Sequence, residues 1–203
     1  MLTAADPLPT RPQRILVAGV SGCGKTTLAA RLGRVLDLPH TEIDSLFHGP
    51  NWVPRTDFTS DVGHLTKGSG WVTEWQYSAV RRMLAERADT LVWLDYPVWL
   101  SMSRLVRRTV RRRLRGQELW NGNFEGPLHG VFTDRDHIIR WGWRTRYKLR
   151  LRVPALEGEF PGLSVVRLHS PAEVEVWLRR LAVVPADAIA DGTATPAATK
   201  DPA

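Results

Sequence analysis

The stretch R-I-L-V-A-G-V-S-G-C-G-K-T, residues 14–26, decides the fold of this chain. It begins as a short apolar run rich in β-branched residues, which is typical of a buried strand. It continues as G-V-S-G-C-G-K-T, residues 19–26, which matches the phosphate-loop pattern G-x-x-x-x-G-K-[ST]. Apolar residues then recur at helical spacing through Leu28, Leu32 and Val35. Strand, loop and helix in this order predict a nucleotide site; a glycine-rich turn with a chance lysine is the disfavoured alternative.

The composition of the loop suits the chemistry of phosphate binding. Its glycines allow successive N–H groups to converge on a β-phosphate beside a helix N-terminus. Lys25 is expected to reach the β and γ oxygens, and the Thr26 hydroxyl to bind Mg²⁺. Cys23 is either a reactive thiol at that helix N-terminus or, the favoured reading, a small residue in a tolerant position. The expected nucleotide-binding residues are Gly19, Ser21, Gly22, Cys23, Gly24, Lys25, Thr26 and Thr27.

Strands and helices alternate along the rest of the chain. Strands are expected at 14–20, 40–44, 71–73, 90–94 and 164–168. Helices are expected at 25–36, 57–65, 78–87, 99–115, 137–151 and 171–181, with a mobile glycine-punctuated loop at 116–130. This alternation predicts an α/β fold with a five-stranded parallel sheet covered on both faces and its ligand at the carboxyl ends of the strands. Residues 14–182 form the predicted single domain, and 1–13 and 186–203 are expected to be flexible tails.

The charge points to an anionic partner. The 203 residues include 28 Lys and Arg against 21 Asp and Glu, a net charge of +7, and the arginines concentrate at 104–115 and 135–152. No apolar run approaches the ~20 residues of a membrane span, and one cysteine excludes an internal disulfide. A cytoplasmic monomer or homodimer is the expectation.

Further stretches carry a family resemblance. E-I-D-S-L at 42–46 and N-W at 51–52 are joined by L-D-Y-P at 94–97 and R-W-G-W-R-T-R at 140–146. Together with the phosphate loop, they resemble the adenylate kinase-related P-loop kinases of the FlaR or topology-modulation type, over roughly residues 14–181. The resemblance implies the nucleoside monophosphate kinase type of fold, with ATP as the nucleotide, an Arg-bearing lid and a small-molecule phosphate acceptor.

One segment departs from the pattern of that group. Where the group carries W-V-I-D-G-N-Y, this chain has W-V-T-E-W-Q-Y at residues 71–77. Glu74 keeps the carboxylate expected to support Mg²⁺, whereas Trp75 replaces a glycine that lets the substrate approach. The departure implies either a reshaped acceptor pocket or lost phosphoryl transfer.

Candidate residues follow from the motifs and the resemblance. Lys25, with Arg108 and Arg112 of the lid, is expected to neutralise the transferring phosphoryl group. Asp44 is expected either to orient or deprotonate the acceptor or to cap a helix. The expected acceptor-binding residues are Asp44, Trp52, Arg81 and Arg144, and the expected metal ligands are Thr26 and Glu74. Solvated surface charge is the alternative for each arginine.

Two functions fit these features. The first is an ATP-dependent kinase of a nucleotide, nucleoside or polar metabolite. The second is an ATP-binding regulatory or nucleic-acid-associated protein without efficient phosphotransfer, whose basic segments would contact a phosphate backbone without sequence specificity.

Overall fold

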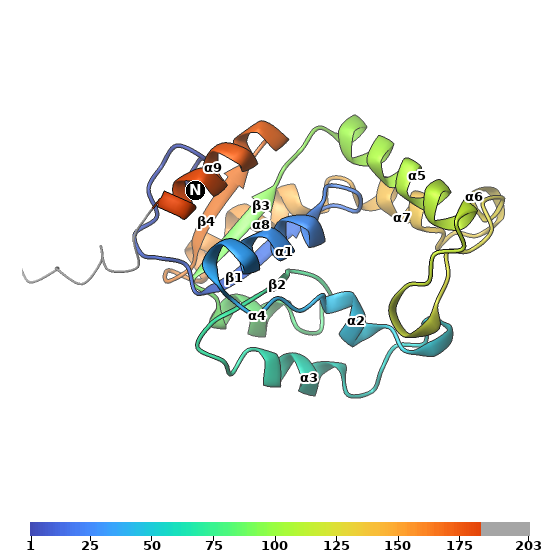
Figure 1. Ribbon diagram of the computed structural model, residues 1–203, viewed down its shortest axis with the longest axis horizontal. Helices are drawn as coiled ribbons and strands as arrows, with labels where there is room; N and C mark the ends of the chain where they lie inside the picture. Colours follow the sequence, from blue (N-terminus) through green and yellow to red (C-terminus); the bar gives the residue numbers. More distant parts are fainter. Residues whose placement is uncertain (184–203) are drawn as a thin grey trace, which may run out of the picture.

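The computed structural model describes residues 1–183, which build a parallel sheet between two layers of helices (Figure 1). Within these residues the sheet has four strands in the order β2-β1-β3-β4. Their bounds are β1 (Arg14–Gly19), β2 (Trp71–Glu74), β3 (Thr90–Leu94) and β4 (Ser164–Leu168). In the register, Val17 lies opposite Glu74 on one side and Val92 on the other. The carboxyl ends of β1 and β2 therefore reach the same edge, where a ligand is expected.

Two apolar clusters hold the helices against the sheet. On one face, α1 (Lys25–Leu36) and α9 (Pro171–Val183) pack over Val17 and Val92. On the other face, α3 (Phe58–Leu65), α4 (Arg81–Arg87) and α8 (Lys148–Glu159) pack over Leu16, Leu91 and three tryptophans. The remaining elements are α2 (Ile43–Phe47), η1 (Pro50–Trp52), α5 (Val98–Leu114), η2 (Trp120–Gly122), α6 (Gly130–Thr133) and α7 (Ile138–Thr145). Both sheet faces are covered, as the alternation predicts.

The expected strand at 40–44 is wrong, which leaves four strands in place of five. His40 forms only an isolated bridge with Val72, and the chain then turns into α2. The turn has an identifiable cause, because the Ile43 N–H donates to the side-chain Oε2 of Glu74 at 2.9 Å and not to the backbone of β2. Asp44 consequently lies in the first turn of a short helix and does not end a strand.

The first residues also differ from the flexible tail expected over 1–13. The Leu2 N–H donates to the Val165 carbonyl at 2.7 Å, and Leu2 forms a parallel bridge with Val166. Ala4 is buried in the cluster beneath α1 and α9. An edge strand presents unpaired backbone groups, and the start of the chain satisfies part of this edge of β4. The tail expected at 186–203 lies outside the described residues. Among the described helices, none has both the length and the apolar character needed to span a membrane.

Candidate active site

The phosphate loop has the backbone that its glycines predict. Gly22 and Gly24 adopt φ values of 84° and 100°, in the left-handed region that favours glycine. A Cβ atom at Gly22 would lie 2.3 Å from the Ser101 carbonyl oxygen, so α5 packs directly on the loop. The Lys25 ammonium donates to the carbonyl of Val20, at the start of the same loop, at 3.4 Å. The loop therefore places a lysine at the N-terminus of α1, which is the arrangement that binds phosphate.

Glu74 and Thr26 lie where a metal ligand set is expected. Glu74 is 2% exposed, and its Oε1 atom is buried without a hydrogen-bond partner among the described residues. Burial raises the pKa of this carboxyl, but His40, the Ile43 N–H and the Thr26 hydroxyl together hold the pKa below its usual range. The Oε1 atom of Glu74 faces Nε2 of His40 at 3.8 Å. An ionised carboxylate beside a hydroxyl offers oxygen ligands of the kind that Mg²⁺ accepts. These two residues thus fit the ion that the phosphate loop implies.

Asp44 is held by side chains that follow β2. Its Oδ1 atom accepts hydrogen bonds of 2.6 Å from both the Gln76 amide and the Tyr77 hydroxyl. The Tyr77 ring stacks on Phe47 with 3.9 Å between centroids, and its hydroxyl lies 3.2 Å from Nε2 of His48. Asp44 accepts no capping hydrogen bond from the backbone of α2, so the capping alternative fails within the described contacts. Sequence reasoning missed Gln76 and Tyr77.

The loop expected to be mobile closes over the segment between Glu42 and Trp52. The indole Nε1 of Trp120 donates to Oε2 of Glu42 at 2.7 Å. The Asn121 amide donates to the carbonyls of Ser45 and His48. We call the contacts of Trp120, Asn121 and Asn123 with this segment the clasp.

Asn123 is the centre of the clasp. It is 3% exposed, and its amide nitrogen donates to the Gly49 carbonyl at 2.9 Å while its Oδ1 accepts from the Trp52 N–H at 2.8 Å. The Trp52 indole donates to the Phe124 carbonyl at 3.2 Å. Trp52, expected to contact the acceptor, therefore also joins the two segments, and its ring remains 38% exposed.

The lid arginines differ in their partners. Arg108 is half-buried, and its Nε atom is shielded without a hydrogen-bond partner among the described residues. Burial, followed by the charge of Arg112, lowers its pKa, and the charges of Glu125, Asp44 and Cys23 oppose this shift. Arg112 is instead engaged with Glu125 at 3.5 Å. Arg108 thus keeps an unpartnered donor, whereas Arg112 is paired.

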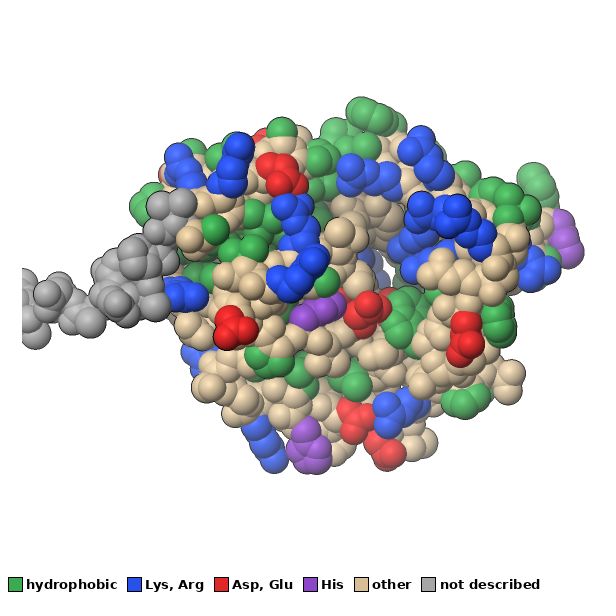
Figure 2. Space-filling model, viewed as in Figure 1, with side chains coloured by type: hydrophobic (Ala, Val, Ile, Leu, Met, Phe, Trp, Pro, Cys, Tyr) green, Lys and Arg blue, Asp and Glu red, His purple; other side chains and the backbone are tan. Residues whose placement is uncertain are grey.

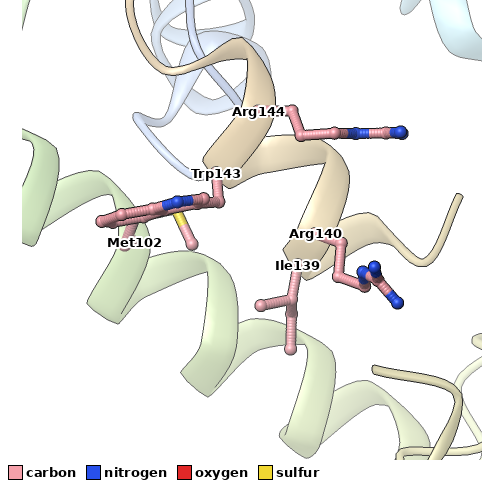
Figure 3. A pocket seen from close by; sticks show the side chains of 5 residues that line it. All are labelled: Met102, Ile139, Arg140, Trp143 and Arg144. Atoms are coloured by element: carbon pink, nitrogen blue, oxygen red, sulfur yellow. The ribbon is translucent and has the colours of Figure 1, made fainter. Parts of the chain in front are cut away.

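Arg144 does not meet the other expected acceptor residues in any contact of the described chain. It pairs with Asp136 at 3.1 Å and lines a groove of about 350 Å³ between α5 and α7 (Figure 3). The helix α7 itself approaches the phosphate loop, because a Cβ atom at Gly142 would lie 3.7 Å from that of Ser21. The other lining residues are Met102, Ile139, Arg140 and Trp143.

Trp75 and Cys23 are both buried. Trp75 is 5% exposed and packs in the apolar cluster with α4 and α8, and its indole donates to the Arg81 carbonyl at 3.1 Å. Cys23 is 1% exposed, and burial raises the pKa of its thiol. Both side chains therefore belong to the packing around the site, and Arg81 lies over the Trp75 ring.

Comparison with known proteins defines the fold. The chain superposes on shikimate kinase from Acinetobacter baumannii, solved in complex with shikimate, with a TM-score of 0.52, 16% identity, and 83% and 90% coverage of the two chains. A gluconokinase from Sinorhizobium meliloti 1021 matches with a TM-score of 0.48 and 21% identity, over 85% of this chain and 94% of that one. The four-stranded α/β fold of the described residues is thus similar to the fold of this shikimate kinase.

Sequence comparison finds only partial relatives. The ATPase subunit HslU of an ATP-dependent protease from Methylorubrum extorquens is 34% identical over 110 residues, which is 53% of this chain and 25% of that protein. HslU from Methylobacterium nodulans is 32% identical over 124 residues, 60% and 28% of the two chains. This chain thus spans about a quarter of the length of these relatives. No protein-family model matches it.

Proposed function

We propose that the chain is a kinase that transfers the γ-phosphate of MgATP to a hydroxyl of a small polar molecule, in the manner of the adenylate kinase-related P-loop kinases. One observation carries the proposal: the segment that ends β2 serves both halves of the reaction. The Thr26 hydroxyl of the phosphate loop is among the groups that lower the pKa of Glu74. Two and three residues after Glu74, Gln76 and Tyr77 donate hydrogen bonds to Asp44. These contacts bring the phosphate loop and Asp44 to the same end of β2, which supports binding of a phosphate donor and an acceptor side by side.

The residues divide the work of phosphoryl transfer. Lys25 and Arg108 place positive charge where the transferring group becomes more negative, and Thr26 and Glu74 would hold Mg²⁺, which neutralises phosphate oxygens when bound. Asp44 accepts the proton of the acceptor hydroxyl while the oxygen of that hydroxyl bonds to the γ-phosphorus. The bond between that phosphorus and the bridging oxygen breaks, and ADP leaves with the electron pair. The clasp excludes water and so limits idle hydrolysis.

The direct test uses γ-labelled ATP, Mg²⁺ and a panel of nucleoside monophosphates, nucleosides, sugars and sugar acids. Chromatography separates labelled acceptor from free phosphate and residual ATP. We expect label on one acceptor class, with little free phosphate. Label that stays on ATP across the panel, or leaves only as free phosphate, would contradict the proposal.

A second candidate function is an ATP-binding protein that associates with nucleic acid. The observation in its favour is that, at the junction of α7 and α8, an arginine lies over exposed aromatic rings. Arg146 lies 4.1 Å from the centroid of Trp143 and 4.8 Å from that of Tyr147, and Trp143 is 54% exposed. Exposed rings beside cations are the surface on which unpaired bases stack. Figure 2 shows further Lys and Arg side chains gathered over α5.

The salt dependence of oligonucleotide binding distinguishes the kinase function from the nucleic-acid-binding function. Binding to a labelled single-stranded oligonucleotide through phosphate contacts falls steeply between ~50 and ~200 mM salt. The second candidate predicts tight oligonucleotide binding at low salt that Trp143→Ala weakens, together with no acceptor labelling. The kinase proposal predicts acceptor labelling that survives this substitution.

A further inference from the structure

His48 follows α2 directly and lies between the clasp and Asp44. Its backbone N–H donates to the Asp44 carbonyl at 3.0 Å, and its own carbonyl accepts a hydrogen bond from the Asn121 amide of the clasp. Its side chain is half-buried, and the Nε2 atom lies 3.2 Å from the Tyr77 hydroxyl. This residue therefore contacts both the closing loop and the tyrosine that holds the proposed base.

The hydrogen bond between His48 and Tyr77 runs from the imidazole to the phenol. The Tyr77 hydroxyl has one proton, which it donates to Oδ1 of Asp44 at 2.6 Å. At its second contact the Tyr77 oxygen must accept, so Nε2 of His48 carries a proton and donates it. Nδ1 of His48 is shielded and has no partner among the described residues, so a second proton on this atom would lack an acceptor. The imidazole is thus neutral, with its proton on Nε2.

A neutral imidazole suits a carboxylate that has to accept a proton. Burial lowers the pKa of His48, and the charge of Asp44 opposes this shift. A positive charge on His48 would favour the ionised form of Asp44 and so make it a weaker base. In its neutral form His48 supports Tyr77, and through it Asp44, without reducing the basicity of the carboxylate.

Two tryptophan rings hold the imidazole in place. The His48 ring packs edge-to-face on Trp52, with 4.9 Å between centroids, and lies nearly parallel to the Trp120 ring at 6.1 Å. Trp120 belongs to the clasp, and the Trp52 backbone is bound to the clasp residue Asn123. Aromatic neighbours in these arrangements favour one orientation of the ring between them. The side chains that orient His48 are therefore those that the clasp brings together.

We propose that His48 is a positioning residue that couples closure of the clasp to the orientation of Asp44. The closed clasp holds the imidazole, the imidazole N–H holds the Tyr77 oxygen, and Tyr77 orients Asp44. When the clasp opens, this chain of hydrogen bonds loses its support, so the base is fully positioned only in the closed site. Transfer to water from the open protein is thereby restrained. The proposal rests on the kinase function and deepens it, because it names what regulates the base.

The first measurement is NMR of the full chain with isotopically labelled histidine, and it needs no substrate. The imidazole nitrogen shifts report the tautomer and charge of each of the six histidines, and His48→Gln identifies the signals of His48. We expect a neutral ring with its proton on Nε2, whose signal shifts in Tyr77→Phe. Asn123→Ala opens the clasp and exposes the ring, so the pKa of His48 should rise toward its ordinary value of 6.5. The exposed His64→Gln is the control and leaves the His48 signals unchanged.

The second measurement is transfer of label from γ-labelled ATP to the acceptor panel. His48→Leu should lower kcat about three- to tenfold at an unchanged KM, because it removes a hydrogen bond that orients the base and no contact with the acceptor. His48→Gln should keep most of the activity, because its amide N–H can take the place of Nε2–H. Since His48 acts through Tyr77, adding His48→Leu to Tyr77→Phe should cause no further loss. His64→Gln leaves kcat unchanged.

The coupling and the kinase function fail separately. Equal kcat in His48→Leu and His64→Gln, losses that multiply in the double variant, or a proton on Nδ1 would each overturn the coupling while leaving the kinase function standing. A His48 pKa that Asn123→Ala does not change overturns the link to the clasp. His48 signals that respond as expected, in a protein that labels no acceptor, support the coupling and contradict the kinase function. If His48→Leu does not fold, the NMR spectra decide.

Discussion

The phenolic hydroxyl of Tyr77 donates a hydrogen bond of 2.6 Å to Oδ1 of Asp44, from a position directly after the end of β2. Burial, and then the charge of Asp44, raises the pKa of Tyr77, so the hydroxyl stays protonated and keeps donating at neutral pH. The bond orients the carboxylate proposed to receive the proton of the acceptor.

Asp44→Asn is expected to lower phosphoryl transfer about 100-fold or more, because a positioned base contributes at least that factor. Tyr77→Phe removes one of two hydrogen bonds to the same oxygen, so we expect a smaller loss of about tenfold. Initial rates of labelled product measure both. The exposed Asp57→Asn is the control, and the pH profile of Tyr77→Phe should keep its shape. Full activity in Asp44→Asn would remove this residue from the mechanism.

Asn123→Ala tests the clasp. The substitution leaves the Gly49 carbonyl and the Trp52 N–H without their partner, so the free energy of unfolding should fall by about 1–3 kcal/mol. Because the clasp excludes water, the ratio of free phosphate to labelled acceptor should rise. Chemical denaturation and product analysis measure the two effects. Gln117→Ala, an exposed change in the same loop, should alter neither; an unchanged hydrolysis ratio in Asn123→Ala would show that the clasp has no such role.

Glu74 makes stability depend on pH. Its folded pKa lies below the ordinary value of 4.5, so the carboxylate stabilises the fold above that value and this contribution is lost as pH falls through the folded pKa. The difference in unfolding free energy between wild type and Glu74→Gln should therefore shrink as the pH is lowered from about 6 to about 3. Urea unfolding across this range measures it, with the exposed Glu118→Gln as control. A difference independent of pH would contradict the assignment.

Cys23 should be chemically inert in the folded protein. The thiol is 1% exposed, and burial raises its pKa despite the nearby Lys25. Thiolate is the reactive form, so iodoacetamide should modify Cys23 slowly in the native chain and rapidly in urea. Mass spectrometry follows the modification. Rapid alkylation of native protein would favour the redox-sensitive alternative.

Local sequence signals predicted the central elements. The apolar runs at 90–94 and 164–168 are strands with those bounds, and 25–36 is the helix after the phosphate loop. Each is long enough, or has enough periodicity, for its own residues to specify it. The segment 40–44 lacks that property, because a hydrogen bond to the Glu74 side chain, 31 positions from Ile43, and not backbone pairing with β2 determines its path.

The site could be predicted only where one motif contains it. The loop residues are contiguous, whereas the Trp120–Glu42 contact joins residues 78 positions apart. No local sequence pattern predicts the Trp120–Glu42 hydrogen bond, because it depends on how α5 and the loop that follows it pack over α2. The surroundings of Trp75 likewise could not be predicted from the sequence, because this side chain packs with Leu149 and Val153, which are more than 70 positions away in the chain.

The central claim is that the phosphate loop serves transfer to an acceptor. It is tested most directly by comparing wild type, Lys25→Ala and the exposed control Lys67→Ala with γ-labelled ATP, Mg²⁺ and the acceptor panel. We predict labelled acceptor from wild type and Lys67→Ala, and none from Lys25→Ala at an unchanged melting temperature. Equal labelling by Lys25→Ala, or no labelled acceptor from wild type, would contradict the kinase function.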